Sequence, residues 1–504
     1  MKFYILSLLA IVLTLSVKAQ DQVAQQYGKV VSTDDLKEYL SIIASDALEG
    51  RETGTRGQKM AAAFIAAHFQ ELGLTGPVNG SYYQPVDLFS STLTEVYLKA
   101  GQTRFDNYSG VVYSGSADSK GEVTIPVVFI GNGTEADLAQ VDVKDKAVLF
   151  LTKETSLRGN KTVAMLREKG AKLLLVNNTE NVSDFDVFAT QMKGFLSGAR
   201  LSLEKPKETT NSGLFLLSPA AVEKTMGTTM EKLKKAAAED PKKNALKKVK
   251  ATTIQYTVTT SLKITKSDNV LGYLEGTDKK DELVVITAHY DHIGKSKSGT
   301  GDLINNGADD DGSGTVSVMA LAKAFATAKS EGKGPRRSIL FMTVTGEEKG
   351  LLGSEYYSEH PIFPLENTVV DLNIDMVGRR DPQHKDSTPY VYVIGSDKLS
   401  AELHTLSESV NKSTTNLIFD YTYNDQNHPE RLYYRSDHWN FAKKNIPIIF
   451  YFDGIHEDYH KPSDEVSKIE FDLLAKRAQC VFFTAWEIAN RDQRIPVDPE
   501  KRIK

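Results

Sequence analysis

The second half of the chain alternates apolar, strand-like runs with helix-like segments, and this alternation constrains the fold more than any other feature. The strand-like runs are almost continuously apolar, as strands are when a parallel sheet is covered on both faces. They are Leu283–Ala288, Ser338–Thr345, Val369–Ile374, Tyr390–Ile394 and Ile446–Phe452. The helix-like segments are Ser313–Lys329, Leu351–Glu359, Leu399–Asn411 and Phe471–Asn490. The pattern predicts a three-layer α/β/α fold with a mixed, mainly parallel central sheet.

Acidic residues and histidines follow four of these strands. In chain order they are His289, Asp291 and His292 after the first strand, Glu347 and Glu348 after the second, Asp375 after the third, and His456, Tyr459 and His460 after the last. A fifth acidic segment, Gly307–Gly314 (GADDDGSG), opens the helix-like segment between the first two strands. Because sites in such sheets lie beyond the carboxyl ends of the strands, we expect these side chains to converge.

The acidic segment does not fit two common loop motifs. An EF-hand calcium loop with Gly312 at its sixth position would need acids at its first and twelfth positions, where the chain has Gly307 and Val318. A phosphate loop needs Gly-Lys-Ser/Thr, which is absent here. Each of these segments taken alone has an ordinary structural explanation. Paired glutamates are favourable at the start of a helix, and a single histidine at a strand end is often a structural residue that binds no metal. Together, mixed nitrogen and oxygen ligands favour zinc or a similar ion, and paired ions are a recurring hydrolytic device.

The polar segments form five ordered motifs: AHYDHIG, NNGADDDGSG, TGEEKGLLGS, NIDMVGR and YHKPSDE. In this order they resemble the secreted dizinc aminopeptidases, whose relatives include bacterial leucyl aminopeptidases, glutamate carboxypeptidase and the transferrin receptor ectodomain. The amino-terminal stretch Ser45–Arg51, with Gly54 close behind, is similar to that family as well. Outside the middle third, the resemblance spans nearly all of the mature chain.

The resemblance implies a site for two Zn²⁺ ions per chain. His289 and Asp375 would bind one ion, and Glu348 and His460 would bind the other. Asp310 would bridge the two ions, and its peptide bond to the following residue would be cis. This set supplies metal ligands without any sulfur.

The resemblance also implies the groups that act on the substrate. Glu347 would be the general base, taking a proton from a metal-activated water and delivering it to the leaving amine. Asp291 would hydrogen-bond the second nitrogen of His289, which fixes the tautomer. Tyr459 would donate a hydrogen bond to the tetrahedral oxyanion, and packing beside His460 is its alternative role.

Three further polar elements have less definite roles. Arg435–His438 precedes the final strand, and the family has a similar Ser-Asp-His there, so this segment would line the substrate pocket or brace a loop. Asp309 and His292 are additional polar neighbours to which we assign no role.

The rest of the chain is expected to lie outside the catalytic domain. Met1–Ala19 has a basic residue, an apolar run and small residues near its end, which predicts a cleaved secretory signal and export to the periplasm, cell surface or exterior. Residues 108–252 resemble a protease-associated domain through Val141–Leu149 (VDVKDKAVL). The catalytic domain would then be discontinuous, formed by residues 20–107 and 253–504.

Composition adds mainly exclusions. The net charge of −5 is too mild to indicate nucleic acid or an anionic membrane as a partner. Cys480 is the single cysteine, so an internal disulfide or a cysteine-based zinc site is excluded, and we expect its side chain to be buried. The nine lysines between residues 223 and 250 predict a solvated helical face.

These observations favour an exported zinc-dependent aminopeptidase that acts on peptides. The main alternative is a carboxypeptidase of the glutamate carboxypeptidase type, because the metal site does not select which chain end is cleaved. A glutaminyl cyclase is a further alternative, although those relatives work with one zinc. An inactive, receptor-like binding protein would be marked by lost ligands, and none of the five is lost. Side-chain preference and oligomeric state are left open.

Overall fold

The computed structural model describes residues 22–503, except 116–117, 155–156, 158, 197–199, 207–212 and 297. The predicted signal peptide therefore lies outside the described residues. Within the described part of the chain, no helix is long and apolar enough to cross a membrane. The chain divides into two compact units: unit 1 comprises Met1–Asp87 and Lys266–Lys504, and unit 2 comprises Leu88–Thr265.

Unit 1 is built on a mixed sheet whose central strands are parallel. In sheet order these are β10 (Arg337–Val344), β9 (Lys279–His289), β11 (Thr368–Ile374) and β14 (Ile448–Phe452). On one side, the last part of β8 (Thr252–Leu274) pairs antiparallel with β10. On the other side, β12 (Tyr390–Ile394) pairs antiparallel with β14, and β13 (Ile418–Asp420) pairs parallel with β12. The predicted mixed, mainly parallel sheet is therefore confirmed.

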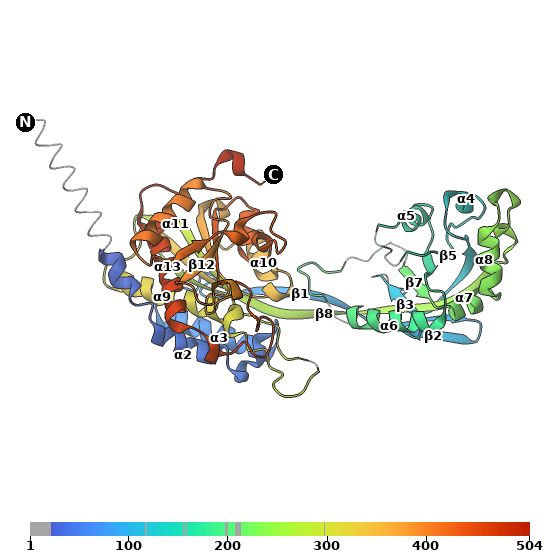
Figure 1. Ribbon diagram of the computed structural model, residues 1–504, viewed down its shortest axis with the longest axis horizontal. Coiled ribbons are helices and arrows are strands. Elements are labelled where there is room, and N and C mark those ends of the chain that lie inside the picture. The colour runs from blue at the N-terminus through green and yellow to red at the C-terminus, as the bar shows by residue number, and fades with distance from the viewer. Residues whose placement is uncertain are drawn as a thin grey trace, which may run out of the picture. The chain divides into compact units, whose positions relative to one another are not determined.

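Helices cover both faces of this sheet, as Figure 1 shows. One face carries α2 (Thr33–Ile43), α3 (Arg56–Glu71), α9 (Gly314–Ser330), α11 (Ala401–Ser413) and α13 (Phe471–Asn490). The other carries α10 (Leu352–Glu359) and α12 (His438–Ala442). Alternate residues of β9 belong to different cores, with Val284 and Ile286 in the first and Leu283 and Val285 in the second. Because both faces of β9 are buried, its sequence is continuously apolar rather than alternating.

Unit 2 has its own set of paired strands and its own hydrophobic cores. Four of its strands are parallel in the order β7 (Gly213–Leu217), β6 (Leu173–Asn177), β5 (Ala147–Leu151) and β4 (Val123–Phe129). The remaining strands are β1 (Tyr83–Ala100), β2 (Thr103–Asn107) and β3 (Gly110–Ser114), together with the first part of β8. Its helices are α4 (Glu135–Leu138), α5 (Lys161–Glu168), α6 (Val182–Leu196), α7 (Pro219–Met226) and α8 (Met230–Ala238).

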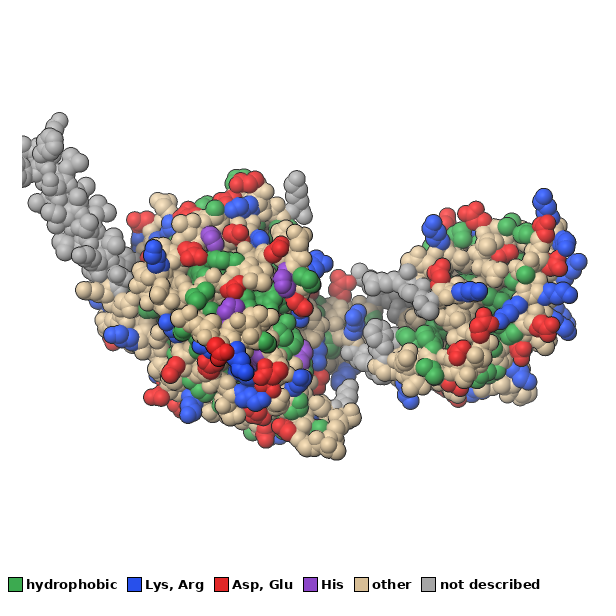
Figure 2. All heavy atoms as spheres, viewed as in Figure 1, with side chains coloured by type: hydrophobic (Ala, Val, Ile, Leu, Met, Phe, Trp, Pro, Cys, Tyr) green, Lys and Arg blue, Asp and Glu red, His purple; other side chains and the backbone are tan. Residues whose placement is uncertain are grey.

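The lysine-rich segment is a solvent-facing surface of unit 2. On α8 the lysines are exposed while Leu233 is buried, and further exposed lysines follow between residues 242 and 250. Figure 2 shows Lys and Arg side chains gathered at the end of unit 2 where Figure 1 places α8. The expectation of a solvated helical face is confirmed.

The boundaries of the inserted unit differ from the expected residues 108 and 252. The structure places them at Asp87/Leu88 and Thr265/Lys266. Both boundaries fall inside long strands, since β1 runs from Tyr83 to Ala100 and β8 from Thr252 to Leu274. A change of domain within a continuous strand has no turn or linker to mark it in the sequence.

Candidate metal centre

The predicted site residues meet at one edge of the unit 1 sheet. The parallel strands β9, β10, β11 and β14 all end at this edge. His289 is the last residue of β9, Glu347 follows β10, Asp375 follows β11, and His460 lies in the loop after β14. The fold therefore brings together residues that are up to 171 positions apart in the chain, as the strand-end argument predicts.

Asp310 stands between two groups of ligand-type side chains. Its Oδ1 lies 3.3 Å from Nε2 of His289, and its Oδ2 lies 3.0 Å from Nε2 of His460. The segment that carries it, Ala308–Ser313, leads directly into α9, and the peptide bond between Asp310 and Asp311 is cis, as the resemblance implies. One carboxylate thus presents a different oxygen to each group.

The first group contains His289, Asp375 and Glu347. Nε2 of His289 is 3.6 Å from Oδ1 of Asp375 and 3.9 Å from Oε2 of Glu347. Asp375 is oriented by Ser436, whose hydroxyl donates to Asp375 Oδ2 at 2.6 Å. Ser436 belongs to the segment Arg435–His438, for which the sequence left two roles open. It lines the cavity beside the site, and it also holds the Asp375 carboxylate.

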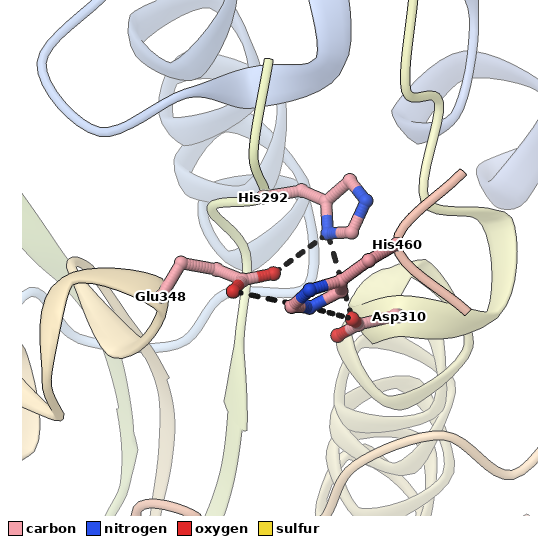
Figure 3. Close-up of side chains that lie close together, drawn as sticks. All are labelled: His292, Asp310, Glu348 and His460. Carbon is pink, nitrogen blue, oxygen red and sulfur yellow. Dashed lines mark hydrogen bonds and ion pairs between the residues drawn. The ribbon is translucent and has the colours of Figure 1, made fainter. Parts of the chain in front are cut away.

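The second group contains Glu348, His460 and His292 (Figure 3). Oε2 of Glu348 is 3.3 Å from Nε2 of His460, and Oε1 of Glu348 is 2.8 Å from Nδ1 of His292. His292 has no role in the sequence-based site, yet its side chain is fully buried among these residues. Its place within the AHYDHIG motif, three residues after His289, was the available signal, but the sequence does not show where its ring points.

The charges of these groups are strongly coupled. Burial would lower the pKa of His289, but the carboxylates of Glu347 and Asp375 outweigh it and raise that pKa well above its usual value. Burial would raise the pKa of Asp310, yet His292, His289 and His460 hold it well below its usual range. The same concentration of negative charge that stabilises protonated imidazoles also favours a cation at this edge.

Glu347 differs from the neighbouring acids. Burial raises the pKa of its carboxyl group well above the ordinary value, and the nearby charges of Glu348 and Asp375 raise it further. For Glu348, the opposing effect of burial is overcome by hydrogen bonds from His292 and His460, which lower its pKa to about 2. Two adjacent glutamates therefore differ in proton affinity, as expected for a proton acceptor beside a metal ligand.

The donor set fits zinc. Imidazole nitrogens and carboxylate oxygens are the ligands that zinc takes when thiolates are absent. Among the described residues, none donates a well-aligned hydrogen bond to Asp310 Oδ2, although it is buried and His460 Nε2 lies 3.0 Å away. Asp310 Oδ2 and His460 Nε2 therefore lie close together without a well-aligned hydrogen bond. Two ligand atoms of one metal ion have this arrangement.

Asp291 acts on His289 through a different atom than expected. Nδ1 of His289 lies 3.0 Å from the backbone carbonyl oxygen of Asp291, whereas the nearest carboxylate oxygen is 3.9 Å away. A carbonyl can only accept, so Nδ1 carries the proton and Nε2 is free to bind a metal. The Asp291 carboxylate instead accepts from the Thr53 hydroxyl at 2.6 Å and from the Glu347 backbone N–H at 3.2 Å. It therefore positions the expected base.

A small cavity of about 40 Å³ opens beside the two groups. Its polar wall contains His289, Asp310, Glu347 and Asp375, and Tyr459 also faces it. Tyr459 is partly buried and its ring stacks on that of His460, with centroids 4.0 Å apart. The apolar wall is formed by Met376, Leu432, Phe450, Phe452 and Ile455, and the lining is completed by Arg435 and Ser436.

Supporting residues that the sequence did not single out hold this edge in place. Asp464 accepts the backbone N–H groups of Asp309 and Asp310, each at 3.1 Å. Asp311 accepts the backbone N–H groups of His289 and Met376, also at 3.1 Å. These acids accept hydrogen bonds from backbone N–H groups, so residue type alone could not distinguish them from the candidate metal ligands.

A three-layer α/β/α fold with paired histidine–carboxylate groups and a partly buried glutamate of raised pKa at the carboxyl edge of its sheet defines a metal-dependent hydrolase. Residues 269–485 match the model of peptidase family M28. All of the matched residues lie in unit 1, which carries the candidate metal centre.

Three individual proteins are also similar to the chain. Over 474 residues the chain is 25% identical to aminopeptidase YwaD of Bacillus subtilis, covering 91% of this chain and 86% of that protein. It is 28% identical over 217 residues to a probable leucine aminopeptidase of Trichophyton verrucosum, covering 42% of this chain and 55% of that one. The solved aminopeptidase from Aneurinibacillus sp. strain AM-1 has a similar fold, with a TM-score of 0.50, 19% identity and coverage of 94% and 98%.

Proposed function

We propose that the chain is a zinc aminopeptidase whose dinuclear site removes amino-terminal residues from peptides. His289 and Asp375 would hold one ion, Glu348 and His460 the other, and Asp310 would bridge them. The observation that carries this proposal is that the two carboxylate oxygens of Asp310 face different groups. One oxygen lies 3.3 Å from Nε2 of His289, and the other lies 3.0 Å from Nε2 of His460.

The reaction needs a nucleophilic water, a proton acceptor and an oxyanion donor. When bound, zinc would supply the Lewis acid that polarises the scissile carbonyl and lowers the pKa of a bound water to about 7. Glu347 lines the cavity, and its partly buried carboxylate has a raised pKa, so it is suited to take the proton and return it to the leaving amine. The Tyr459 hydroxyl is suited to donate to the oxyanion, because its side chain lines the same cavity.

The lining of the cavity favours cleavage at the amino end. The metal ligands themselves do not select the chain end, so the choice rests on the other residues that line the cavity. A carboxypeptidase needs unpaired arginines, whereas Arg435 in this lining is bound to Glu430 at 2.8 Å. The apolar lining residues are suited to an uncharged amino-terminal side chain.

The remaining parts of the chain fit an exported enzyme. We propose that Met1–Ala19 directs export and that the unit from Leu88 to Thr265 is an insert of the protease-associated type. The support for both is the sequence pattern, in particular the VDVKDKAVL segment, which ends in the buried strand β5.

The test uses matched peptides and two variants. A leucine peptide with a free amino end should release leucine whether its carboxyl end is free or amidated, and an acetylated amino end or a zinc chelator should abolish release. Glu347→Gln should keep two zinc ions and lose about 10²- to 10⁴-fold in kcat, while Asp310→Ala should lose zinc by elemental analysis. Release only from free carboxyl ends would refute the aminopeptidase proposal, and full activity of Glu347→Gln would refute its role as the base.

A further inference from the structure

We propose that His292 is a positioning residue of the second metal site: its Nδ1–H holds Oε1 of Glu348 so that Oε2 faces the ion shared with His460. This inference rests on the proposed function, since it concerns the ion held by Glu348 and His460. It assigns a role in metal binding to a histidine that does not itself bind the metal.

The Glu348 carboxylate is held by a different imidazole at each oxygen. Nδ1 of His292 lies 2.8 Å from Oε1, a normal distance for a charge-assisted hydrogen bond, and Nε2 of His460 lies 3.3 Å from Oε2 (Figure 3). Since ligands of a tetrahedral zinc ion at 2.0–2.1 Å stand about 3.3 Å apart, the contact with Oε2 has the spacing of two ligands. The contact with Oε1 is shorter and has the spacing of a hydrogen bond.

Other contacts of His292 also distinguish it from a ligand. Its Nδ1 is 3.7 Å from Asp310 Oδ2, which is farther than the 3.0 Å from His460. A metal-bound histidine usually donates its other N–H to a neighbour, as His289 does to the carbonyl of Asp291. Nε2 of His292 is buried without a hydrogen-bond partner in the described chain, which suits an unprotonated nitrogen and a proton on Nδ1.

The surroundings fix the ring in this orientation. The backbone N–H of His292 donates to the carbonyl of Arg51 at 3.2 Å, and the side chain is fully buried. Gly307 leaves the space that the ring occupies, because a Cβ there would lie 2.6 Å from Cδ2 of His292. The ring meets that of His460 edge to face, with centroids 5.6 Å apart. A side chain held this tightly can fix the Glu348 carboxylate.

The test compares His292→Asn with His292→Ala. The amide N–H of asparagine occupies nearly the position of imidazole Nδ1–H, so it can still donate to Glu348, whereas alanine cannot. We expect His292→Ala to weaken the binding of one of the two zinc ions 10- to 100-fold in a chelator competition, with the other zinc much less affected. His292→Asn should bind both ions within about threefold of the unsubstituted chain, and its Co²⁺-loaded form should keep the same visible absorption, because no nitrogen ligand is lost.

Several outcomes would overturn the inference. If His292→Asn binds zinc as weakly as His292→Ala, or if its Co²⁺ spectrum changes, His292 is a direct ligand instead. If His292→Ala binds both ions normally, His292 has no role in the site. Failure of the unsubstituted chain to bind two zinc ions would overturn the proposed function as well, so the two failures are distinguishable. Equal thermal melting of the metal-free proteins checks that both variants fold.

Discussion

Replacing Arg51 by methionine should destabilise unit 1 strongly. The Arg51 side chain is fully buried, and its guanidinium donates to four backbone carbonyls. The acceptors are Ile43 at 2.8 Å, Tyr290 at 2.8 Å, Asn306 at 2.6 Å and Gly307 at 3.0 Å. One side chain therefore joins the end of α2, the residue after β9 and the loop that leads to Asp310. Methionine keeps much of the apolar stem and removes all five donors.

The magnitude follows from two opposing effects. Hydrogen bonds to a charged group contribute about 1.5–3 kcal/mol each, so four of them give a gross loss of about 6–12 kcal/mol. Burial lowers the pKa of Arg51, which shows that desolvation of its charge opposes folding, although Asp310 and Asp311 partly compensate. Removing the charge recovers that desolvation cost, so we expect a net loss of about 3–5 kcal/mol, typical for breaking a buried charged network.

The measurement is chemical unfolding followed by tryptophan fluorescence in the presence of a zinc chelator. The two tryptophans of the chain, Trp439 and Trp486, both lie in unit 1, so the signal reports that unit. The chelator prevents a change in zinc binding from contributing to stability. Arg56→Met is the matched control, because Arg56 is exposed and surface substitutions usually change stability by about 0.5 kcal/mol or less. Equal unfolding free energies for Arg51→Met and Arg56→Met would refute the reasoning.

Three further predictions concern the site and its surroundings. Tyr459→Phe removes the proposed oxyanion donor and should lower kcat about 10²- to 10³-fold with little change in KM, so a kcat within about threefold of the unsubstituted enzyme would contradict that role. Gly314→Ala would place a Cβ 2.3 Å from both Asp311 Oδ1 and the Ile374 carbonyl, so its melting temperature should fall, and an unchanged melting temperature would contradict the close approach. Burial raises the pKa of the Cys480 thiol to about 12, so the native protein should not react with a thiol reagent at pH 8. After unfolding, one thiol per chain should react, and rapid labelling of the folded protein would contradict the prediction.

Most of the unit 1 sheet could be predicted because its strands are buried on both faces. The expected strand Val369–Ile374 corresponds to β11 (Thr368–Ile374), and the expected helix Phe471–Asn490 has the same limits as α13. The long strand β8 was not predicted, since much of its middle is polar and exposed and shows neither a continuous nor an alternating apolar pattern. The short strand β13 has few residues on which a pattern could be detected.

The ligand candidates could be predicted for a different reason. Strand ends fix where a residue lies, so His289, Glu347 and Asp375 were placed at one edge without knowledge of any contact. Which atom of a residue acts depends on side-chain and backbone torsions, which the sequence does not specify. Asp291 illustrates this point, because it contacts His289 through its carbonyl and Glu347 through its carboxylate.

The run of three aspartates shows most clearly what the sequence leaves undetermined. Asp309 accepts the backbone N–H of Gly378 at 2.7 Å, and its other oxygen lies 3.1 Å from Nε2 of His456. Asp310 faces the two groups of candidate ligands. Asp311 accepts the backbone N–H of Gly314 at 2.9 Å as well as those of two strand-end residues.

Three chemically identical neighbours therefore have three different partners, and the backbone alone distinguishes them. The residues Ala308–Ser313 do not form a regular helix, since Asp310 and Asp311 have non-helical torsions. Successive carboxylates consequently point in directions that helical spacing would not give. If this segment shifted by one residue, the carboxylate of Asp309 or Asp311 would enter the candidate metal site in place of Asp310. The backbone N–H groups that now donate to that carboxylate would then be left unpaired. Asp309 and Asp311 thus fix the register that makes Asp310, and not either neighbour, the carboxylate available to both groups.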